Sequence, residues 1–276
     1  MKIAVAGLGL IGGSICKSLK KNTRHTIFGL DTDKKTVELA LMEEAIDLEI
    51  MPQQLYGAEV TFVCLYPEAT IDFILENIPN WKKGAIVIDV CGIKSDIVQR
   101  VAAPLKEAGI RFVGAHPMAG REFSGFAYAQ ADLFKSASFI ITPIRDTDPD
   151  AVRVAEQLAS EMQFGKIVHA SPEEHDRVIA FTSQLAHIVS NAYIKSPSAQ
   201  LRYGFSAGSY QDLTRVARLN EDMWTSLFMR NRIPLIAEID TIIQNLTEYR
   251  DALAKEDAQR LHDLLRDGRE IKEQLN

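Results

Sequence analysis

The first 170 residues of the chain alternate between two kinds of hydrophobic pattern. Short apolar runs rich in β-branched residues, typical of buried strands, lie at 2–6, 26–30, 60–65, 85–90, 110–114, 138–142 and 166–169. Stretches with helical spacing lie between them, at 14–20, 34–42, 71–75, 95–108 and 152–161. Strands that alternate with helices are typical of βαβ units, so this part of the chain is predicted to form a parallel sheet covered by helices.

The strand pattern stops at Ser171, and only helical spacing follows. Ser171-Pro172-Glu173-Glu174 is a good helix start, and a long apolar helix is expected from about Pro172 to Ile194. A terminal amphipathic helix is expected to present on one face Leu246, Leu253, Leu261, Leu264 and Ile271. The sequence therefore predicts an α/β protein, with a doubly wound Rossmann-type parallel sheet at residues 1–168 and an all-helical second domain at residues 169–276.

Composition narrows the class of protein. A chain of 276 residues suits two domains of roughly 100 to 200 residues each, and 46% hydrophobic residues can fill two cores. The net charge of -6 and the dispersed basic residues argue against a nucleic-acid partner. No apolar stretch reaches the ~18 residues that span a bilayer and no leader precedes the first strand, which predicts a cytoplasmic protein without a membrane partner. The cysteines, Cys16, Cys64 and Cys91, lie far apart and are interpreted as buried hydrophobic residues rather than disulfide or metal ligands.

A glycine-rich turn joins the first strand to the first helix. Gly7 is expected to make the tight bend, Gly9 to let a pyrophosphate approach the backbone, and Gly12 to let the helix pack closely on the strand. The next strand ends in Asp31, where a ribose-binding carboxylate is expected. The alternative is an ordinary strand-to-helix turn capped by Asp31. The predicted dinucleotide site consists of Gly7, Leu8, Gly9, Leu10, Ile11, Gly12 and Asp31.

The end of that second strand also predicts which dinucleotide is bound. Asp31 would accept both ribose hydroxyls of NAD but would repel the 2'-phosphate of NADP. Thr32 and Asp33 offer no arginine to bind that phosphate. NAD is therefore the expected cofactor.

Two segments at strand ends are candidates for chemistry, because ligands of open parallel sheets bind at the carboxyl ends of the strands. They are residues 89–94 and 114–120. His116 directly follows its strand and is held by Pro117, so its imidazole is expected to project into the crevice near the nicotinamide. A general base with a pKa near neutrality would suit this place. The alternative is a histidine that caps a turn.

The helical part contributes further polar side chains in apolar surroundings. On the long helix, Asp176, Ser183 and His187 share one face, which indicates either a cavity or polar residues satisfied at a helix interface. Ser183 and His187, four residues apart, could bond directly. Arg215 lies in an apolar neighbourhood, where a partly buried guanidinium requires an anion; the alternative is an ion pair to Asp212 or Asp222.

Several motifs together resemble the prephenate and arogenate dehydrogenases of tyrosine biosynthesis. In addition to the glycine turn they are HPMAGREFSG at 116–125, SPEEHD at 171–176, SQLAH at 183–187 and DLTRVA at 212–217, with Trp224 and Asn231 downstream. The resemblance implies an NAD-dependent enzyme that oxidises C4 of a cyclohexadienol ring while CO2 leaves from C1. It implies that His116 is the catalytic histidine on the C4 hydroxyl, that His187 and Arg215 bind substrate, and that Glu122, Ser183 and Asp176 complete the substrate pocket.

The order of the chemistry suggests which substrate group Arg215 binds. An arginine on the departing carboxylate would hold its charge in place and oppose the loss of CO2, since only interactions that strengthen in the transition state accelerate a reaction. Arg215 is therefore expected on the side-chain carboxylate.

One position departs from the pattern of the family. Many relatives carry a serine that orients the catalytic histidine and the nicotinamide, where this chain has Gly92. Gly92 is still expected to contact the cofactor. Ser95, Cys91 or a water would supply the missing hydrogen bond, or the histidine is held differently. Lys94 matches the family and is expected to support the loop.

Other functions remain as alternatives at this point. A β-hydroxyacid dehydrogenase or imine reductase would carry a catalytic lysine on the long helix, where Lys195 is the only lysine and lies at the far end. A non-catalytic NAD-sensing regulator would not need His116. Prephenate and arogenate are not distinguished, because Glu122 could attract the amine of arogenate or pair with an arginine. The apolar surface of residues 171–276 exceeds what such a unit buries alone, which predicts a homodimer through the helical domain.

Overall fold

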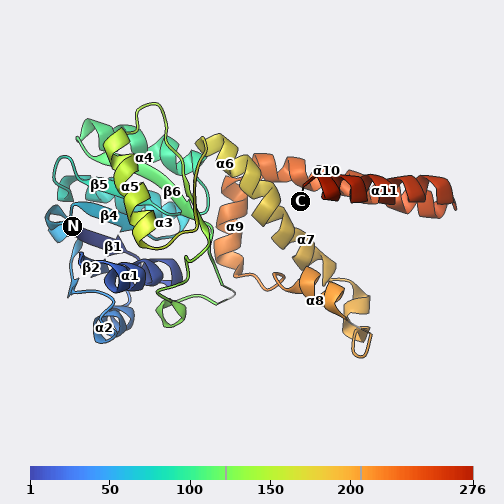
Figure 1. Cartoon of the computed structure of the whole chain (residues 1–276), viewed down its shortest axis with the longest axis horizontal. Coiled ribbons are helices and arrows are strands. Elements are labelled where there is room, and N and C mark those ends of the chain that lie inside the picture. The colour runs from blue at the N-terminus through green and yellow to red at the C-terminus, as the bar shows by residue number, and fades with distance from the viewer. Residues whose placement is uncertain (122, 206, 276) are drawn as a thin grey trace.

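A computed structural model describes residues 1–121, 123–205 and 207–275 of the chain. Within these residues one eight-stranded sheet runs in the order β3-β2-β1-β4-β5-β6-β7-β8. Its strands are β1 (Lys2–Ala6), β2 (Thr26–Leu30), β3 (Leu48–Glu49), β4 (Val60–Val63), β5 (Ile86–Asp89), β6 (Arg111–Pro117), β7 (Ser138–Ile141) and β8 (Lys166–His169). The sheet and its helices form one body, and the later helices extend away from it (Figure 1).

The sheet is parallel except at one pair of strands. β6 and β7 are antiparallel, with His116 opposite Ile140. The predicted parallel, doubly wound sheet is confirmed, with this one antiparallel pair at its edge. His116 lies inside β6 rather than after it, because pairing with β7 extends the strand to Pro117. The two-residue β3 has no counterpart in the sequence prediction, because a strand that short leaves no hydrophobic pattern.

Helices cover both faces of the sheet, as a doubly wound fold requires. One hydrophobic core includes Ile15 of α1 and Leu158 of α5, and a second core on the other face includes Ile74 of α3 and Val101 of α4. These apolar positions recur at helical spacing, which is why the segments form helices against the sheet. The helices of this domain are α1 (Leu10–Asn22), α2 (Lys34–Met42), α3 (Pro67–Asn77), α4 (Ser95–Glu107) and α5 (Pro149–Glu161).

The second domain is entirely helical over its described residues. The predicted long helix is present as α6 (Pro172–Ile179), a π-helical turn (Ala180–Leu185) and α7 (Ala186–Tyr193). Ser171 caps its start by accepting a hydrogen bond from the Glu174 N–H. The remaining helices are α8 (Gly208–Thr214), α9 (Glu221–Arg230), α10 (Arg232–Ala254) and α11 (Ala258–Gln274). None of the described helices is long and apolar enough to span a bilayer.

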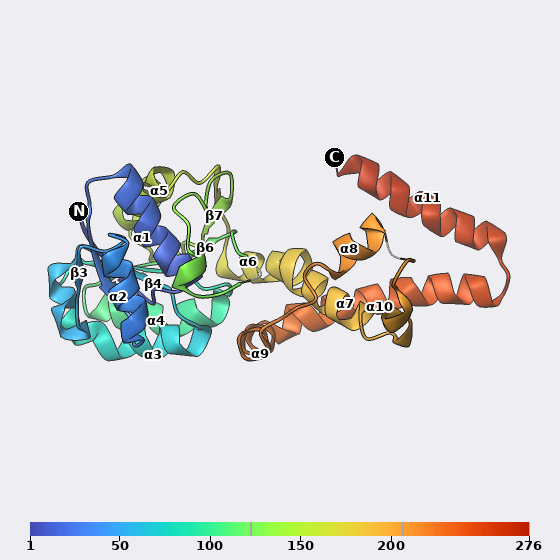
Figure 2. The ribbon, with the colours of Figure 1, turned by 90° about the horizontal axis from the view of Figure 1, so that it is seen from below.

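The terminal segment differs from the prediction of one amphipathic helix. The chain turns after Ala254, where Glu256 adopts a φ of 54°, and Asp257 caps the start of α11. α11 therefore folds back from the end of α10, and the two helices form an open hairpin that widens away from the turn (Figure 2). Apolar residues recur at helical spacing in both helices, so the hydrophobic pattern runs on without a visible break. The turn between the helices is made by the short polar sequence Lys255-Glu256-Asp257.

Candidate active site

The glycine turn has the geometry of a close strand-to-helix approach. Gly7 has a φ of 88°, and a side chain there would meet the Cys64 carbonyl oxygen at 2.5 Å. A Cβ on Gly12 would lie 1.8 Å from the Gly7 carbonyl oxygen. A Cβ on Gly9 would meet nothing within 4 Å, so open space lies before the start of α1, whose first turn carries no acidic residue. A phosphate group fits this helix end, because its free N–H groups and dipole favour an anion.

Asp31 lies beside this turn at the end of β2. One carboxylate oxygen accepts the Leu8 N–H at 2.7 Å, and the other accepts the Asp33 N–H at 2.9 Å. The cap of α2 is Asp33, which accepts the Lys35 N–H. The carboxylate of Asp31 is thus held next to the phosphate-binding turn, where it can receive hydroxyl groups of a ribose.

The imidazole of His116 is held by a chain of hydrogen bonds from the helical domain. His116 Nδ1 lies 2.9 Å from His175 Nε2, and His175 Nδ1 lies 2.8 Å from Asp176 Oδ1. Because a carboxylate only accepts, His175 donates through Nδ1, and its Nε2 then accepts the proton of His116 Nδ1. This arrangement leaves His116 Nε2 with a free lone pair.

Asp176, at the end of this chain of bonds, is anchored to the nucleotide domain. Its two carboxylate oxygens accept the backbone N–H groups of Lys94 and Ser95, each at 2.8 Å. Both N–H groups lie at the start of α4, where a helix has no partners of its own for them. Asp176 therefore joins α6 to α4, and its hydrogen bond to His175 Nδ1 also fixes the position of that ring.

The pKa values of this group follow from its burial. Burial lowers the pKa of His116 well below its ordinary value, and nearby His175 and Lys94 lower it further. Burial also lowers the pKa of His175, although its bond to Asp176 opposes this. Burial raises the pKa of Asp176, but hydrogen bonds from His175 and Ser95 outweigh it, so the pKa falls below its ordinary value. The group is a carboxylate and two neutral imidazoles, and the expectation of a near-neutral pKa for His116 is wrong because the sequence does not show how deeply the ring is desolvated.

The loop after β5 is held from beneath by a buried ion pair. Lys94 is fully buried, pairs with Asp89, and donates to the Ala115 carbonyl at 2.7 Å. A Cβ on Gly92 would lie 3.7 Å from His116 Nε2 and 3.6 Å from Leu227 of α9. His175 holds the other ring nitrogen of His116, Nδ1, so the structure leaves the alternatives for the missing serine at Nε2 as predictions. Lys94 supports the loop as expected.

A second group of side chains lies on the helical domain. His187 Nδ1 donates to the Val216 carbonyl at 3.1 Å, and its ring lies 4.0 Å from that of Trp224, centroid to centroid. Burial lowers the pKa of His187, and the nearby charge of Arg215 contributes in the same direction. Trp224 and Leu227 are three residues apart on α9, so one helix contacts both His187 and the loop beside His116.

Some predicted details of this second group are wrong. Arg215, the residue that ends α8, is exposed rather than partly buried, and among the described residues no ion pair joins it to Asp212 or Asp222. Ser183 is half-buried and, within the described part of the chain, makes no hydrogen bond to His187. The π-helical turn at 180–185 widens the spacing that the prediction assumed. Glu122 lies outside the described residues.

His175 is the functional candidate that sequence reasoning missed. The only local signal was a histidine directly before Asp176 in SPEEHD. Its partner, His116, is 59 residues away in sequence, and the folded chain brings them together.

The cysteines were predicted to be buried hydrophobic residues. Cys16 and Cys91 are buried and Cys64 is half-buried.

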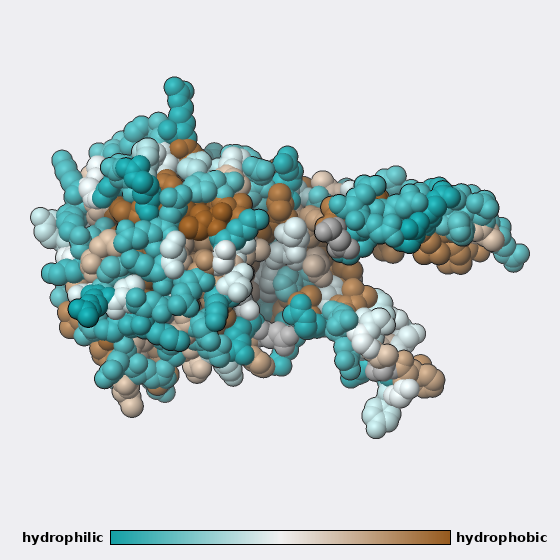
Figure 3. Space-filling view, viewed as in Figure 1, coloured by the Kyte–Doolittle hydropathy of each residue, from teal (hydrophilic) through white to brown (hydrophobic). Residues whose placement is uncertain are grey.

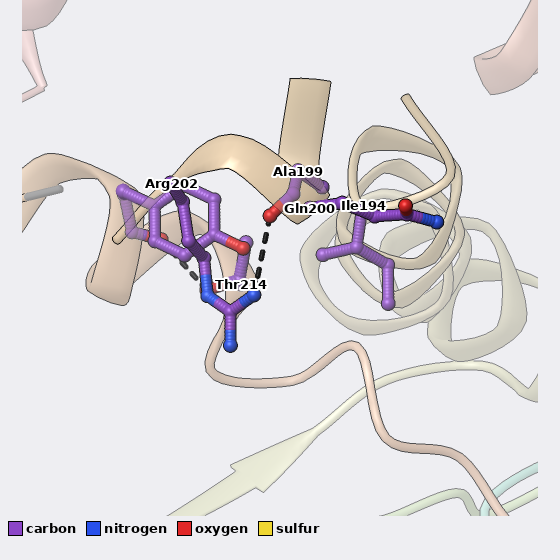
Figure 4. Close-up of a pocket in the computed structure, with 6 residues that line it drawn as sticks. Ile194, Ala199, Gln200, Arg202 and Thr214 are labelled. Carbon is purple, nitrogen blue, oxygen red and sulfur yellow. Dashed lines mark hydrogen bonds between the residues drawn. The ribbon is translucent and has the colours of Figure 1, made fainter. Parts of the chain in front are cut away.

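A cavity of about 460 Å³ opens at the far end of the helical domain, between the end of α7 and α8 (Figure 4). None of the predicted site residues lines it. Its walls are formed by Ile194, Ala199, Gln200, Arg202, Tyr210 and Thr214.

Comparison with known proteins agrees with the fold and its division into two domains. Over residues 15–168 the chain matches the nucleotide-binding domain of prephenate dehydrogenase, and over residues 171–267 its dimerization domain. It is 31% identical to the prephenate dehydrogenase of Bacillus subtilis (strain 168), covering 94% of this chain and 72% of the relative. It is 29% identical to the cyclohexadienyl dehydrogenase of Zymomonas mobilis, covering 92% of this chain and 89% of the relative.

Solved structures show the same architecture. Synechocystis arogenate dehydrogenase superimposes with a TM-score of 0.83 at 26% identity, covering 100% of both chains. Prephenate dehydrogenase from A. aeolicus, solved with hydroxyphenyl propionate and NAD+, superimposes with a TM-score of 0.88 at 23% identity, covering 100% of this chain and 99% of the other. Because the two domain models match most of the chain, in order and with their boundary at the end of β8, the chain belongs to the prephenate dehydrogenase family.

Proposed function

We propose that this protein catalyses the NAD-dependent oxidative decarboxylation of prephenate, or of its amino analogue arogenate. The observation that carries the proposal is the chain of hydrogen bonds from Asp176 through His175 to His116, which leaves His116 Nε2 as a free acceptor beside the cofactor edge of the sheet. A neutral imidazole in this state is the group that removing a hydroxyl proton requires.

The chemistry balances around this one histidine. Bound NAD+ supplies a hydride acceptor for C4 of the ring. His116 Nε2 takes the proton of the C4 hydroxyl, so the oxygen becomes a carbonyl as the C–H electrons leave. The bond from C1 to the carboxylate then breaks, its electron pair aromatises the ring, and CO2 departs. The phenolate oxygen takes the proton back from His116, which returns the base to its starting state.

The other predicted site residues are assigned to binding. We propose that Arg215 binds the side-chain carboxylate, that His187 contacts the same end of the substrate, and that Ser183 and Glu122 complete the pocket. Asp176 acts through His175. The turn from Gly7 to Gly12 and the loop at Gly92 would border the cofactor. Family membership supports these roles, as do the contact of Trp224 with His187 and the proximity of Arg215 to His187.

NAD rather than NADP is the proposed cofactor, because the Asp31 carboxylate lies 2.7 Å from the Leu8 N–H at the glycine turn. A 2'-phosphate there would meet a negative charge. Asp31→Ser should therefore narrow the preference for NAD, measured as the ratio of kcat/KM with the two cofactors. A wild-type enzyme with a higher kcat/KM for NADP would contradict this role of Asp31.

We further propose that residues 1–168 form the nucleotide domain and residues 169–276 a domain that binds substrate and joins two copies of the chain. The match to a dimerization domain supports this. So do the exposed apolar side chains Ile236, Ile243, Leu246 and Leu265 of the α10–α11 hairpin. In Figure 3 hydrophobic surface is visible along the lower edge of this otherwise hydrophilic arm. Hydrophobic surfaces of this kind are typical of obligate dimers.

The decisive experiment is the rate of NADH formation with prephenate and, separately, with arogenate. His116→Asn should lower kcat by roughly 10²- to 10⁴-fold with little change in KM, since the base acts in the transition state. Arg215→Ala should mainly raise KM. A purified wild type that turns over neither substrate would overturn the proposal, and an Asn variant with wild-type kcat would move the role of the base to His187.

A further inference from the structure

Helix α9 forms a wall of the candidate site, yet it packs only in part on the nucleotide domain. Leu227 is the α9 residue that joins the core beneath α3 and α4, and it is only partly buried there. A cavity of about 370 Å³ lies between α9 and α4, lined by residues of α9, by Asp96 of α4 and by Arg232 of α10. Where side-chain packing is incomplete, other contacts must fix the helix.

The last residue of α9 makes those contacts. Arg230 forms ion pairs with Glu68, in the first turn of α3, and with Asp96, in the first turn of α4. Both ion pairs link the helical domain to the nucleotide domain. The guanidinium side chain is 22% exposed, so the pairs are partly shielded from water.

The next residue fixes the same point to the helical domain. Asn231 is buried, and its amide donates to the Asp176 carbonyl at 2.9 Å and to the Gln184 side chain at 2.7 Å. Two consecutive residues thus tie one end of α9 to both domains. Leu227 and Trp224 follow one and two turns back along the helix, against Gly92 and His187.

We propose that Arg230 is a positioning residue, which holds α9 across the domain boundary so that Leu227 and Trp224 close the site next to His116 and His187. Its two partners begin the helices that follow β4 and β5, the central strands at the cofactor edge. Arg230 therefore connects the cofactor side of the site to the substrate side. This inference rests on the proposed function for what the site binds, but the position of α9 can be tested without turnover.

The test compares Arg230→Met with Arg100→Met. Arg100 of α4 pairs with the same Glu68 at 3.2 Å but lies wholly within the nucleotide domain, so it is a matched control. Arg230→Met should raise the KM for prephenate by at least about fivefold and lower kcat by less than about threefold, whereas Arg100→Met should leave both within about twofold. Arg230→Lys should recover most of the lost affinity, because it keeps a cation within reach of one carboxylate.

The second readout is the fluorescence of Trp224, obtained by subtracting the spectrum of a Trp224→Phe variant. The chain has two tryptophans, and Trp81 is buried in the nucleotide domain. In Arg230→Met the Trp224 emission should shift to longer wavelength as the ring leaves His187, and in Arg100→Met it should not move. If Arg230→Met does not fold, the double variant Glu68→Gln/Asp96→Asn removes the same ion pairs and should give the same shift.

These outcomes separate the two proposals. Equal KM values and equal emission for Arg230→Met and Arg100→Met would overturn the positioning role. A wild type without activity on either substrate would overturn the proposed function. A Trp224 shift in Arg230→Met that is absent from Arg100→Met would still support the positioning role of Arg230.

Discussion

The nucleotide domain and the helical domain are stabilised in different ways. The nucleotide domain has two extended hydrophobic cores, one on each face of its sheet, with fully buried side chains such as Phe62 and Phe139. The core of the helical domain contains three buried residues, Ala180, Leu185 and Leu235, in the described part of the chain. The nucleotide domain thus buries its apolar side chains within itself, whereas many apolar side chains of the helical domain are exposed in the single chain.

The candidate catalytic residues lie where these two differently packed domains meet. The proposed base, His116, lies on a strand of the well-packed domain, and its orienting partners, His175 and Asp176, lie on the first helix of the other domain. The best-anchored part of the helical domain is the part that touches the nucleotide domain. We infer that the catalytic geometry is fixed at this boundary and that the outer helices serve to join a second copy.

The largest expected effect comes from the exposed face of α10. Ile243→Asp combined with Leu246→Asp places two charges on the proposed dimer surface. The dimer dissociation constant should rise at least about a hundredfold, because buried unpaired charges are strongly unfavourable. Sedimentation at micromolar concentration measures the change, with Gln244→Glu, an exposed polar position on the same helix, as control. A double variant that sediments like wild type would remove this face from the dimer.

The second prediction tests whether His175 of the helical domain orients the imidazole of His116 in the nucleotide domain. His175→Ala removes the partner of His116 Nδ1 and with it the preference for one tautomer. We expect kcat to fall about 10- to 100-fold while KM changes less than about threefold. His169→Ala is the control, since this exposed histidine pairs with Glu156 away from the site. An unchanged kcat in His175→Ala would show that His116 is oriented by other contacts.

The third prediction concerns the pH dependence of kcat, which should reflect the burial of His116. Burial lowers the pKa of His116 well below the 6.5 of an ordinary histidine, and the reaction needs the neutral ring. The kcat should therefore fall as the pH drops through this lowered pKa, with a midpoint well under pH 6.5, and remain constant around pH 7. The acid limb should be absent from the residual activity of His116→Asn. A limb centred at or above pH 6.5 would show that the site is wetter than the structure indicates.

The smallest expected effect is that of Gly92→Ser. A Cβ there would lie 3.6 Å from Leu227 and 3.7 Å from His116 Nε2, which are ordinary contacts. We expect the free energy of unfolding to change by less than about 1 kcal/mol and kcat by less than about fivefold. Gly7→Ser, at a φ of 88° and against a backbone oxygen, should destabilise by about 2 kcal/mol or more. Thermal unfolding of the two variants distinguishes a tolerant glycine from a required one.

Much of the nucleotide domain could be predicted because its signals are local. The strands at 2–6, 26–30 and 166–169 agree with the prediction residue for residue. For the buried β1 the reason is that an inner parallel strand is a continuous apolar run. The glycine turn was also recognisable, because Gly7 and Gly12 are required by contacts with the adjacent strand and turn. The antiparallel β6–β7 pair was not, since strand direction within a sheet depends on the path of the intervening chain.

The sequence by itself therefore determined the alternation of strands and helices, the dinucleotide turn and the candidate base, all of which follow from neighbours within a few residues. Only the tertiary structure decided that His175 orients His116, that burial lowers their pKa values, that Arg215 is exposed, and that the terminal segment is a hairpin. Each of these depends on which distant segments meet and how much water they exclude, and neither quantity is encoded in local periodicity.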